Sequence, residues 1–193
     1  MKTEKIMRAI AEHINDTTKQ LDHRQVQKLT DEIKKAKRVF VYGAGRSGLA
    51  ARAFAMRLVQ LGLTSYVIGE TVTPAITKED LLLLVSGSGE TNTVLSTAKA
   101  AKPMGAKIAS ITSYPNSSVG KLSDLTVQIK GKQKADIEKD HLKHQIEGVH
   151  SSLTPLGTLF EDTVLVFLDG VVGNLMVELN KNETEMEKRH ATI

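Results

Sequence analysis

Five short apolar segments alternate with helical segments, and this alternation limits the possible folds of the chain more than any other feature. The apolar segments, most of them rich in β-branched residues, are 38–42, 65–68, 81–86, 107–112 and 125–129. Nearly continuous apolar strands are typical of parallel sheets, because helices cover both faces of such a sheet. Helical segments at 47–61, closed by Gly62, and at 91–102, ended by Pro103, connect successive strands. The pattern predicts a doubly wound α/β fold with a five-stranded parallel sheet flanked by helices.

Two helices are predicted before the first strand, within residues 1–36. Apolar side chains recur at helical spacing in both: Ile6, Ile10 and Ile14 in the first, and Val26, Leu29 and Ile33 in the second. Asp22 is a candidate cap for the second helix, because its carboxylate can accept hydrogen bonds from free backbone N–H groups. With 193 residues, the chain fits a single domain, 1–193, that is large enough to bury a sizeable core.

Two segments in the second half depart from the strand–helix pattern. Residues 130–152 are highly charged, and we expect an exposed insertion or a short lid helix there. Beyond them, apolar residues at helical spacing predict one long helix: Phe160, Val164, Phe167, Val171, Leu175 and Leu179. Apolar residues on its other faces make it more apolar than one packing face requires. Such a helix is expected to pack against a second subunit as well as its own sheet, so we expect a homo-oligomer.

Composition argues against several classes of partner. The net charge is +4, and 4% of the residues are aromatic, with no Trp, so a stacking platform for nucleic acid is not expected. The N-terminus is charged throughout, and the apolar runs are too short to span a membrane. The absence of Cys excludes a disulfide framework. We expect a cytoplasmic protein that binds neither nucleic acid nor membrane.

The loop after the first predicted strand has the glycine spacing of phosphate-binding loops. It reads Gly43-Ala-Gly45-Arg46-Ser47-Gly48, the Gly-x-Gly-x-x-Gly fingerprint of dinucleotide-binding folds. Glu70 follows Gly48 by about 20 residues, where such folds place a ribose-binding acid. A helix cap or a hydrogen bond to a sugar hydroxyl is the alternative role for Glu70. This loop alone leaves a nicotinamide- or flavin-dependent oxidoreductase open.

A second loop, after the third predicted strand, favours a smaller ligand. It reads Ser86-Gly87-Ser88-Gly89-Glu90-Thr91 and leads directly into a helix. Glycines leave backbone N–H groups open, the helix start carries a positive partial charge, and the hydroxyl groups add donors. This arrangement suits a single phosphate group. A dinucleotide whose pyrophosphate binds the first loop would not need this second binding site. The alternative is an ordinary turn with a helix cap. We predict a phosphorylated small molecule as the ligand.

These features resemble the sugar isomerase (SIS) domain family, whose mark is a Ser-Gly-Ser-Gly-x-Thr loop after the third strand of a flavodoxin-like sheet. The resemblance runs from about Ile33 to the C-terminus, apart from 130–152. Within that family the chain is similar to the 6-phospho-3-hexuloisomerases. This closer likeness rests on Phe-Ala-Met-Arg-Leu at 54–58, Val-Ile-Gly-Glu at 67–70, Pro-Leu-Gly-Thr-Leu-Phe-Glu at 155–161 and Lys-Arg-His-Ala at 188–191.

The resemblance implies a cofactor-free enzyme, typically a tetramer. It would interconvert D-arabino-3-hexulose 6-phosphate and D-fructose 6-phosphate, a step of the ribulose monophosphate pathway used in formaldehyde fixation. Moving a ketone from C3 to C2 shifts a proton between these carbons through an enediol. The shift needs a base and dipoles that stabilise the enediolate, but no redox cofactor or metal.

The resemblance also assigns residues to these tasks. Glu161 is the expected base, and His190 the expected acid or base for the sugar oxygens, acting across a subunit boundary if the tail is tied down. The expected substrate-binding residues are Gly45, Arg46, Ser47, Ser86, Gly87, Ser88 and Thr91. Three of these residues also have a purely structural alternative. Glu161 could interact with the helix dipole as a carboxylate at a helix start, a role that Asp162 can also fill. His190 could be a solvated side chain, and Arg46 could form a surface salt bridge.

One position departs from the family pattern. Relatives often carry a His at position 60, where this chain has Gln60. Gln donates hydrogen bonds but cannot transfer protons near neutral pH, so either this position only orients substrate or the chain relies on His190. His141 and His144 in the charged segment have the spacing of metal ligands, but nothing there predicts burial, and we expect no metal site.

Three rival functions remain open from the sequence. One is an aldose–ketose isomerase of the same family that acts on another phosphosugar. Another is a non-catalytic module that senses a sugar phosphate, which would need neither Glu161 nor His190. The third is a dinucleotide-dependent oxidoreductase, which a shift in NADH fluorescence would reveal.

Overall fold

The structure, a computed structural model, describes residues 2–131, 154–155 and 157–190. Its strands are β1 Val39–Gly43, β2 Ser65–Val67, β3 Leu81–Val85, β4 Lys107–Thr112 and β5 Leu125–Gln128. They form one five-stranded sheet in the order β2-β1-β3-β4-β5, and every neighbouring pair is parallel. The predicted doubly wound sheet is confirmed. The segment predicted as an insertion at 130–152, with His141 and His144, lies almost wholly outside the described residues.

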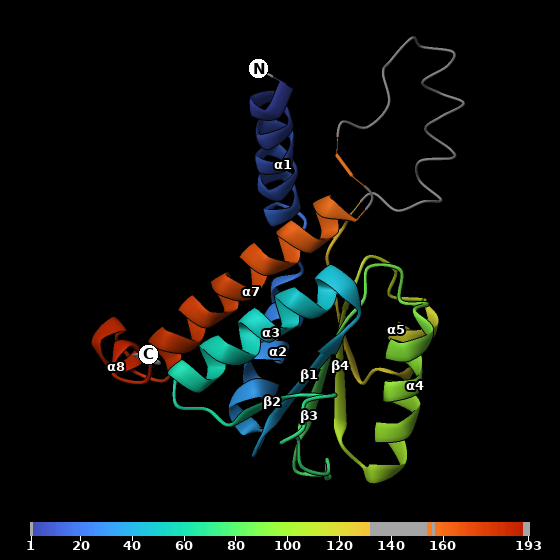
Figure 1. Cartoon of the computed structure of the whole chain (residues 1–193), viewed down its shortest axis with the longest axis vertical. Coiled ribbons are helices and arrows are strands. Elements are labelled where there is room, and N and C mark those ends of the chain that lie inside the picture. The colour runs from blue at the N-terminus through green and yellow to red at the C-terminus, as the bar shows by residue number, and fades with distance from the viewer. Residues whose placement is uncertain (1, 132–153, 156, 191–193) are drawn as a thin grey trace.

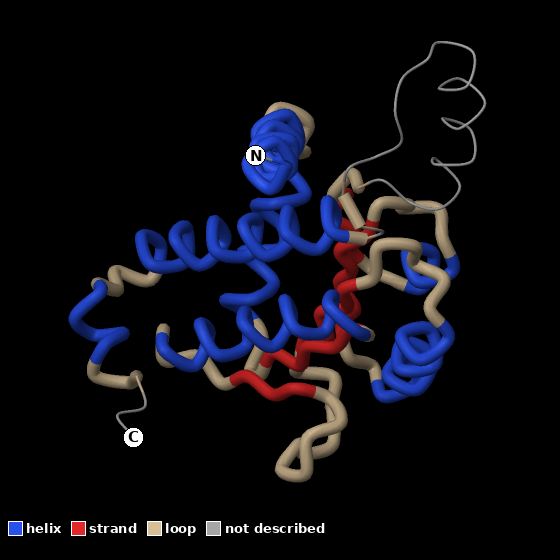
Figure 2. The backbone as a smooth tube through the Cα atoms, turned by 45° about the horizontal axis from the view of Figure 1, so that its top comes forward, coloured by secondary structure: helices blue, strands red, loops and turns tan. Residues whose placement is uncertain are grey.

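Helices cover both faces of this sheet (Figure 1). On one face lie α2 His23–Lys35, α3 Gly45–Gln60 and α7 Thr158–Glu178. On the other lie α4 Asn92–Ala101, which continues into a 3-10 turn over Lys102–Met104, and α5 Ser118–Leu122. The short α8 Glu183–Glu187 follows α7, and α1 Lys2–Thr18 packs against α7 and extends away from the sheet (Figures 1 and 2).

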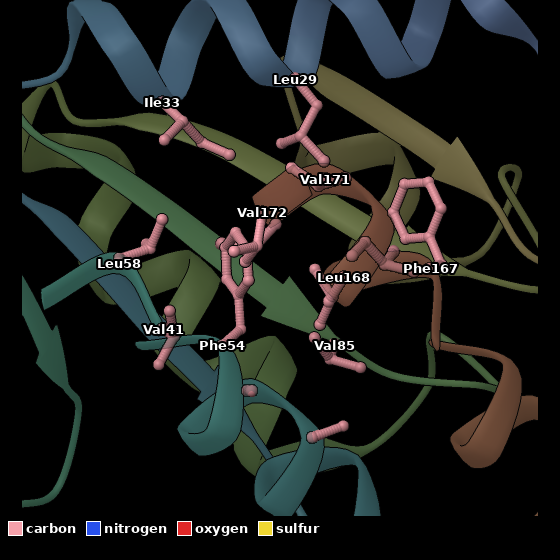
Figure 3. Close-up of a cluster of buried hydrophobic side chains, with 14 of the residues drawn as sticks. Leu29, Ile33, Val41, Phe54, Leu58, Val85, Phe167, Leu168, Val171 and Val172 are labelled. Atoms are coloured by element: carbon pink, nitrogen blue, oxygen red, sulfur yellow. The ribbon is translucent and has the colours of Figure 1, made fainter. Parts of the chain in front are cut away.

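Strand residues alternate between two hydrophobic cores, as the pleat of a β-strand requires. In β1, Val39 and Val41 face α2, α3 and α7, whereas Phe40 faces α4. Figure 3 shows the first of these cores, in which Phe54 of α3 lies near Val172 of α7 and Leu168 of α7 lies near Val85 of β3. The central strand β3 is buried at every position, which explains why its sequence is apolar without interruption.

The ends of the helices follow the predicted signals. The Asp22 carboxylate accepts hydrogen bonds from the backbone N–H groups of Arg24 and Gln25, at 2.9 Å and 3.3 Å, and so caps α2. Gly62, just beyond α3, adopts φ +89°, a left-handed conformation that glycine adopts without the Cβ clash of other residues. These local signals fix where α2 begins and where α3 stops.

A largely buried ion pair lies at the amino-terminal edge of the sheet. Arg38, before β1, donates hydrogen bonds of 2.9 Å and 2.7 Å to Asp80, before β3. Asp80 also accepts bonds from the backbone N–H and the hydroxyl of Thr77. Burial alone would raise the pKa of Asp80, but the bonds from Arg38 and Thr77 outweigh it and hold that pKa below its usual value. The pair therefore links the starts of two neighbouring strands.

The carboxyl-terminal edge carries the loops of interest. Gly43 and Val85 are register partners at the ends of β1 and β3, so the loops that follow these strands begin side by side. β2 lies on one side of β1, and β3, β4 and β5 lie on the other. Ligands of open α/β sheets bind where the strand order reverses in this way.

Candidate active site

The first loop is a tight turn from β1 into α3. Gly43 and Gly48 approach so closely that a Cβ on Gly48 would lie 2.4 Å from the Gly43 carbonyl oxygen. Gly45 adopts φ +57°, again a conformation suited to glycine. The glycine spacing is thus explained by the turn itself. Arg46 and Ser47 follow in the first turn of α3, Arg46 exposed and Ser47 buried.

The second loop gathers hydroxyl groups. Ser86 Oγ lies 3.3 Å from Thr91 Oγ1 and accepts the N–H of Gly89 at 3.2 Å. Ser88 Oγ accepts the N–H of Glu90 at 3.2 Å. These hydroxyl and amide donors converge on one short stretch of chain, and a bound phosphate can take their hydrogen bonds.

Helices α3 and α4 begin at these loops without a capping side chain. Their N-cap residues, Ala44 and Thr91, make no side-chain hydrogen bond to the helix. By contrast, the side chains of Asp22, Ser117 and Asn182 cap α2, α5 and α8. The first N–H groups of α3 and α4 therefore remain available to another acceptor. An anion placed there would also be stabilised by the two helix dipoles.

Glu161 and Arg46 connect α7 to the first loop. Arg46 Nε lies 2.6 Å from Glu161 Oε2, and Arg46 Nη2 donates to Asp162 Oδ1 at 2.6 Å. The Glu161 side chain is 18% exposed. Its Oε2 atom is buried and accepts no hydrogen bond, so its contact with Arg46 is ionic. Glu161 therefore holds a largely buried carboxylate beside a cation.

His190 and Gln60 lie at the opposite end of α3 and α7. Both line a surface pocket of about 450 Å³ together with Arg57 and Asp169. Gln60 is buried and accepts a hydrogen bond from Arg57 Nη1 at 3.1 Å. Arg46 stands at the start of α3 and Gln60 at its end, so the helical rise separates them by about 20 Å. Within one chain, His190 does not reach Glu161.

The predicted residues thus fall into two groups. The residues predicted to bind substrate lie on two adjoining loops, the first of which Arg46 connects to Glu161: Gly45, Arg46, Ser47, Ser86, Gly87, Ser88 and Thr91. His190 lies apart from them. The role of Asp162 as a partner of Arg46 was not predicted, although its place beside Glu161 was the available signal. Glu70 forms an ion pair with Arg52 of α3, and the alternative of a helix cap is wrong.

The structure also bears on metal binding and on membrane crossing. Among the described residues, no three His, Cys, Asp or Glu side chains are grouped closely enough to share a metal ion. In the same part of the chain, no helix combines the length and hydrophobicity that crossing a membrane requires.

The family model of the SIS domain matches residues 32–142, a range that contains all the strands and both loops. The chain belongs to the SIS domain family. A 3-hexulose-6-phosphate isomerase of Bacillus subtilis is 34% identical to this SIS chain over 193 residues and covers 100% of both chains. Another, of Methanocaldococcus jannaschii, is 41% identical over 169 residues, which are 88% of this chain and 84% of that protein.

A solved structure supports the same relationship for this SIS domain. It is a Methanococcus jannaschii protein whose crystal structure is described as inferring a molecular function of 3-hexulose-6-phosphate isomerase. The two chains are 36% identical, with a TM-score of 0.80 over 100% of this chain and 99% of the other. The parallel sheet and its flanking helices are therefore those of a sugar isomerase domain.

Proposed function

We propose that this protein is a 3-hexulose-6-phosphate isomerase that interconverts D-arabino-3-hexulose 6-phosphate and D-fructose 6-phosphate without a cofactor, as a step of the ribulose monophosphate pathway. One observation carries the proposal: Arg46 pairs with the Glu161 carboxylate in the first loop, which begins beside the hydroxyl-lined loop at the start of α4. Relatives that match most of the chain and bear this enzyme name support it.

The proposed reaction is a proton shift between neighbouring carbons. The phosphate of the substrate binds residues 86–91 and the open N–H groups of α4. Glu161 removes the proton from C2 of the 3-ketose, and the electron pair of that C–H bond forms the enediolate. Glu161 then returns the proton to C3, while a second group moves a proton from the C2 hydroxyl to the C3 oxygen. The Arg46 guanidinium stabilises the negative charge of the intermediate.

His190 is the proposed second group, supplied by a neighbouring subunit of a homo-oligomer, a tetramer by family resemblance. Its distance from Glu161 within one chain motivates this assignment. Large apolar side chains that remain exposed on α3 support an assembly: Leu49 is 64% exposed and Met56 is 50% exposed. Large apolar side chains left exposed on one helix are a feature of surfaces that pack against a partner.

The direct test compares wild type with Glu161→Gln. With 3-hexulose 6-phosphate as substrate, wild type is expected to form fructose 6-phosphate, and the variant to lose about a hundredfold or more in kcat, because Gln cannot accept the carbon-bound proton. Ser96→Ala, an exposed change in the middle of α4, serves as the control. Equal rates for wild type and Glu161→Gln would remove Glu161 from the mechanism.

Mixing two inactive variants tests whether subunits share a site. Glu161→Gln and His190→Ala, unfolded together and refolded as mixed oligomers, are expected to recover about a quarter of the wild-type rate, because some interfaces then carry two intact residues. If no activity is recovered, either both residues act in a site formed by one chain, or His190 takes no part in the reaction.

The same assays separate the rival functions. Turnover of another phosphosugar, but not of 3-hexulose 6-phosphate, would indicate a different SIS isomerase. Tight binding of fructose 6-phosphate without turnover of any phosphosugar would indicate a sensing module. The expected cytoplasmic location stays a prediction, which cell fractionation tests.

A further inference from the structure

We propose that Glu90 is a positioning residue, which fastens the phosphate loop, residues 86–91, to the start of α5 and does not itself contact the ligand. The inference rests on the proposed function, because it takes this loop as the seat of the phosphate group. Its central observation is a hydrogen bond of 2.8 Å from the N–H of Ser118, the first residue of α5, to Glu90 Oε1.

The back of the phosphate loop is already held by its neighbours. The carbonyl oxygen of Gly87 accepts bonds from Ser113 N–H, at 3.1 Å, and from the Thr112 hydroxyl, at 3.3 Å. The carbonyl oxygen of Gly89 accepts the N–H of Val119 at 3.0 Å. Two backbone carbonyl groups of the loop are thus fixed by hydrogen bonds to the end of β4 and to the segment that follows it. The Glu90 bond extends this set of anchors to the point where the loop enters α4.

The chemistry of Glu90 explains why it must be held. An unrestrained carboxylate in a loop that binds phosphate would repel the ligand, because both carry negative charge. Ser118 donates to Glu90 from its hydroxyl and from its backbone N–H, and these bonds lower the pKa of Glu90. The side chain therefore remains charged but is turned toward α5.

The bond is not needed to cap α5. Ser117 already does so, because its hydroxyl oxygen accepts the N–H of Gly120 at 3.2 Å. Glu90 and Ser118 instead couple two loops that follow neighbouring strands, β3 and β4. This coupling is what a positioning role requires.

Three variants test it. Glu90→Ala removes the carboxylate, and Glu90→Gln keeps an oxygen that can accept the Ser118 bond. Ser118→Pro removes the donor N–H while leaving Glu90 intact. Pro is well tolerated at the first position of a helix, and the preceding Ser117 has φ −65° and ψ 170°, as a residue before Pro prefers. Glu12→Ala, on the exposed surface of α1, is the matched loss of a carboxylate elsewhere.

The measurements are the Kd of fructose 6-phosphate by calorimetry, KM and kcat, the melting temperature, and amide hydrogen exchange of residues 86–91. Glu90→Ala is expected to raise Kd and KM about tenfold, to speed exchange in the loop, and to leave kcat within about twofold. Ser118→Pro is expected to weaken binding at least as much, because a freed carboxylate then lies beside the phosphate. Glu90→Gln and Glu12→Ala are expected to bind like wild type.

The outcomes separate this inference from the proposed function. If wild type, Glu90→Ala and Ser118→Pro all bind fructose 6-phosphate equally well, the positioning role of Glu90 is wrong. The proposal that residues 86–91 bind the phosphate group is then unaffected. A fall in kcat and melting temperature with KM unchanged would make Glu90 merely structural, which also overturns the role. If wild type does not bind fructose 6-phosphate, both the phosphate loop and the role of Glu90 fail.

Discussion

Arg46 connects parts of the site that are remote in the sequence. Its guanidinium contacts Glu161 and Asp162, two adjacent residues at the start of α7. The sequence could suggest that Arg46 and Glu161 serve one site, because a family motif contains each of them. It could not show that they touch, since helical or strand periodicity describes neighbours along one element and not contacts between two elements. A contact of this kind depends on how α3 and α7 pack.

Gly89 is a second residue whose role only the packing reveals. It adopts φ +65°, and a Cβ on it would lie 1.9 Å from the Ser117 hydroxyl oxygen. Gly69 provides a matched case, with φ +97° but no atom within 4 Å of such a Cβ. Comparing the two positions separates backbone strain from steric overlap.

Gly69→Ala is expected to cost about 1 kcal/mol of unfolding free energy, from backbone strain alone. Gly89→Ala is expected to cost about 3 kcal/mol or more, because overlap with Ser117 is added. Urea unfolding of both variants measures the difference. Equal losses would mean that the loop moves aside freely, which would contradict the tight packing described above.

At the scale of helices and strands, most of the fold is predictable from the sequence. The strand predicted at 107–112 is β4 with the same bounds, and the helix predicted at 47–61 differs from α3 by two residues at its start. These segments could be predicted from the sequence because the strands are buried on both faces and Gly62 marks the end of α3. Local pattern could not reveal that Arg38 and Asp80 pair, since the two residues precede separate strands.

The Arg38–Asp80 pair makes a pH-dependent contribution to stability. Because the folded protein lowers the pKa of Asp80 below the usual value of 3.8, the contribution is complete above that pH and is lost as the pH falls through the folded pKa. Asp80→Asn is expected to cost about 3 kcal/mol at neutral pH, since it leaves the partly buried Arg38 without a counter-charge. The cost is expected to shrink below about pH 4.

Neighbouring residues supply the control for this prediction. Lys37 and Glu79 form an ion pair at the same edge of the sheet, but their side chains are 66% and 59% exposed. Glu79→Gln is therefore expected to cost less than about 1 kcal/mol at any pH. Urea unfolding from neutral to acid pH measures both variants, and a constant cost for Asp80→Asn would refute the linkage.

At the scale of the whole molecule, exposed apolar side chains are the feature that one subunit does not explain. The sequence indicated that α7 is more apolar than one packing face needs, and Val166 of α7 is indeed 48% exposed. The exposed apolar residues of α3 were not predicted, because the helix also carries the polar residues expected of a surface. α3 and α7 lie side by side (Figure 1), and we therefore propose these two helices as the contact surface of the expected homo-oligomer.

Met56→Glu tests this face. Glu has a high helix propensity, so the helix itself is expected to remain stable. A charge inside an apolar interface is costly, and the oligomer is expected to dissociate at concentrations where wild type stays assembled. Light scattering after size-exclusion chromatography measures this. Val72→Glu, at a side chain 81% exposed in the loop after β2, is expected to change nothing.

The two ends of the strands have different chemistry, and this division matters for engineering. The buried pair of Arg38 and Asp80 lies at the amino ends, whereas the hydroxyl-lined loop and the Arg46–Glu161 pair lie at the carboxyl ends. Substitutions at the amino-terminal edge of the sheet are therefore expected to change heat tolerance without disturbing the proposed active site. A protein engineer can vary the amino-terminal edge of the sheet and leave the loops at its carboxyl-terminal edge unchanged.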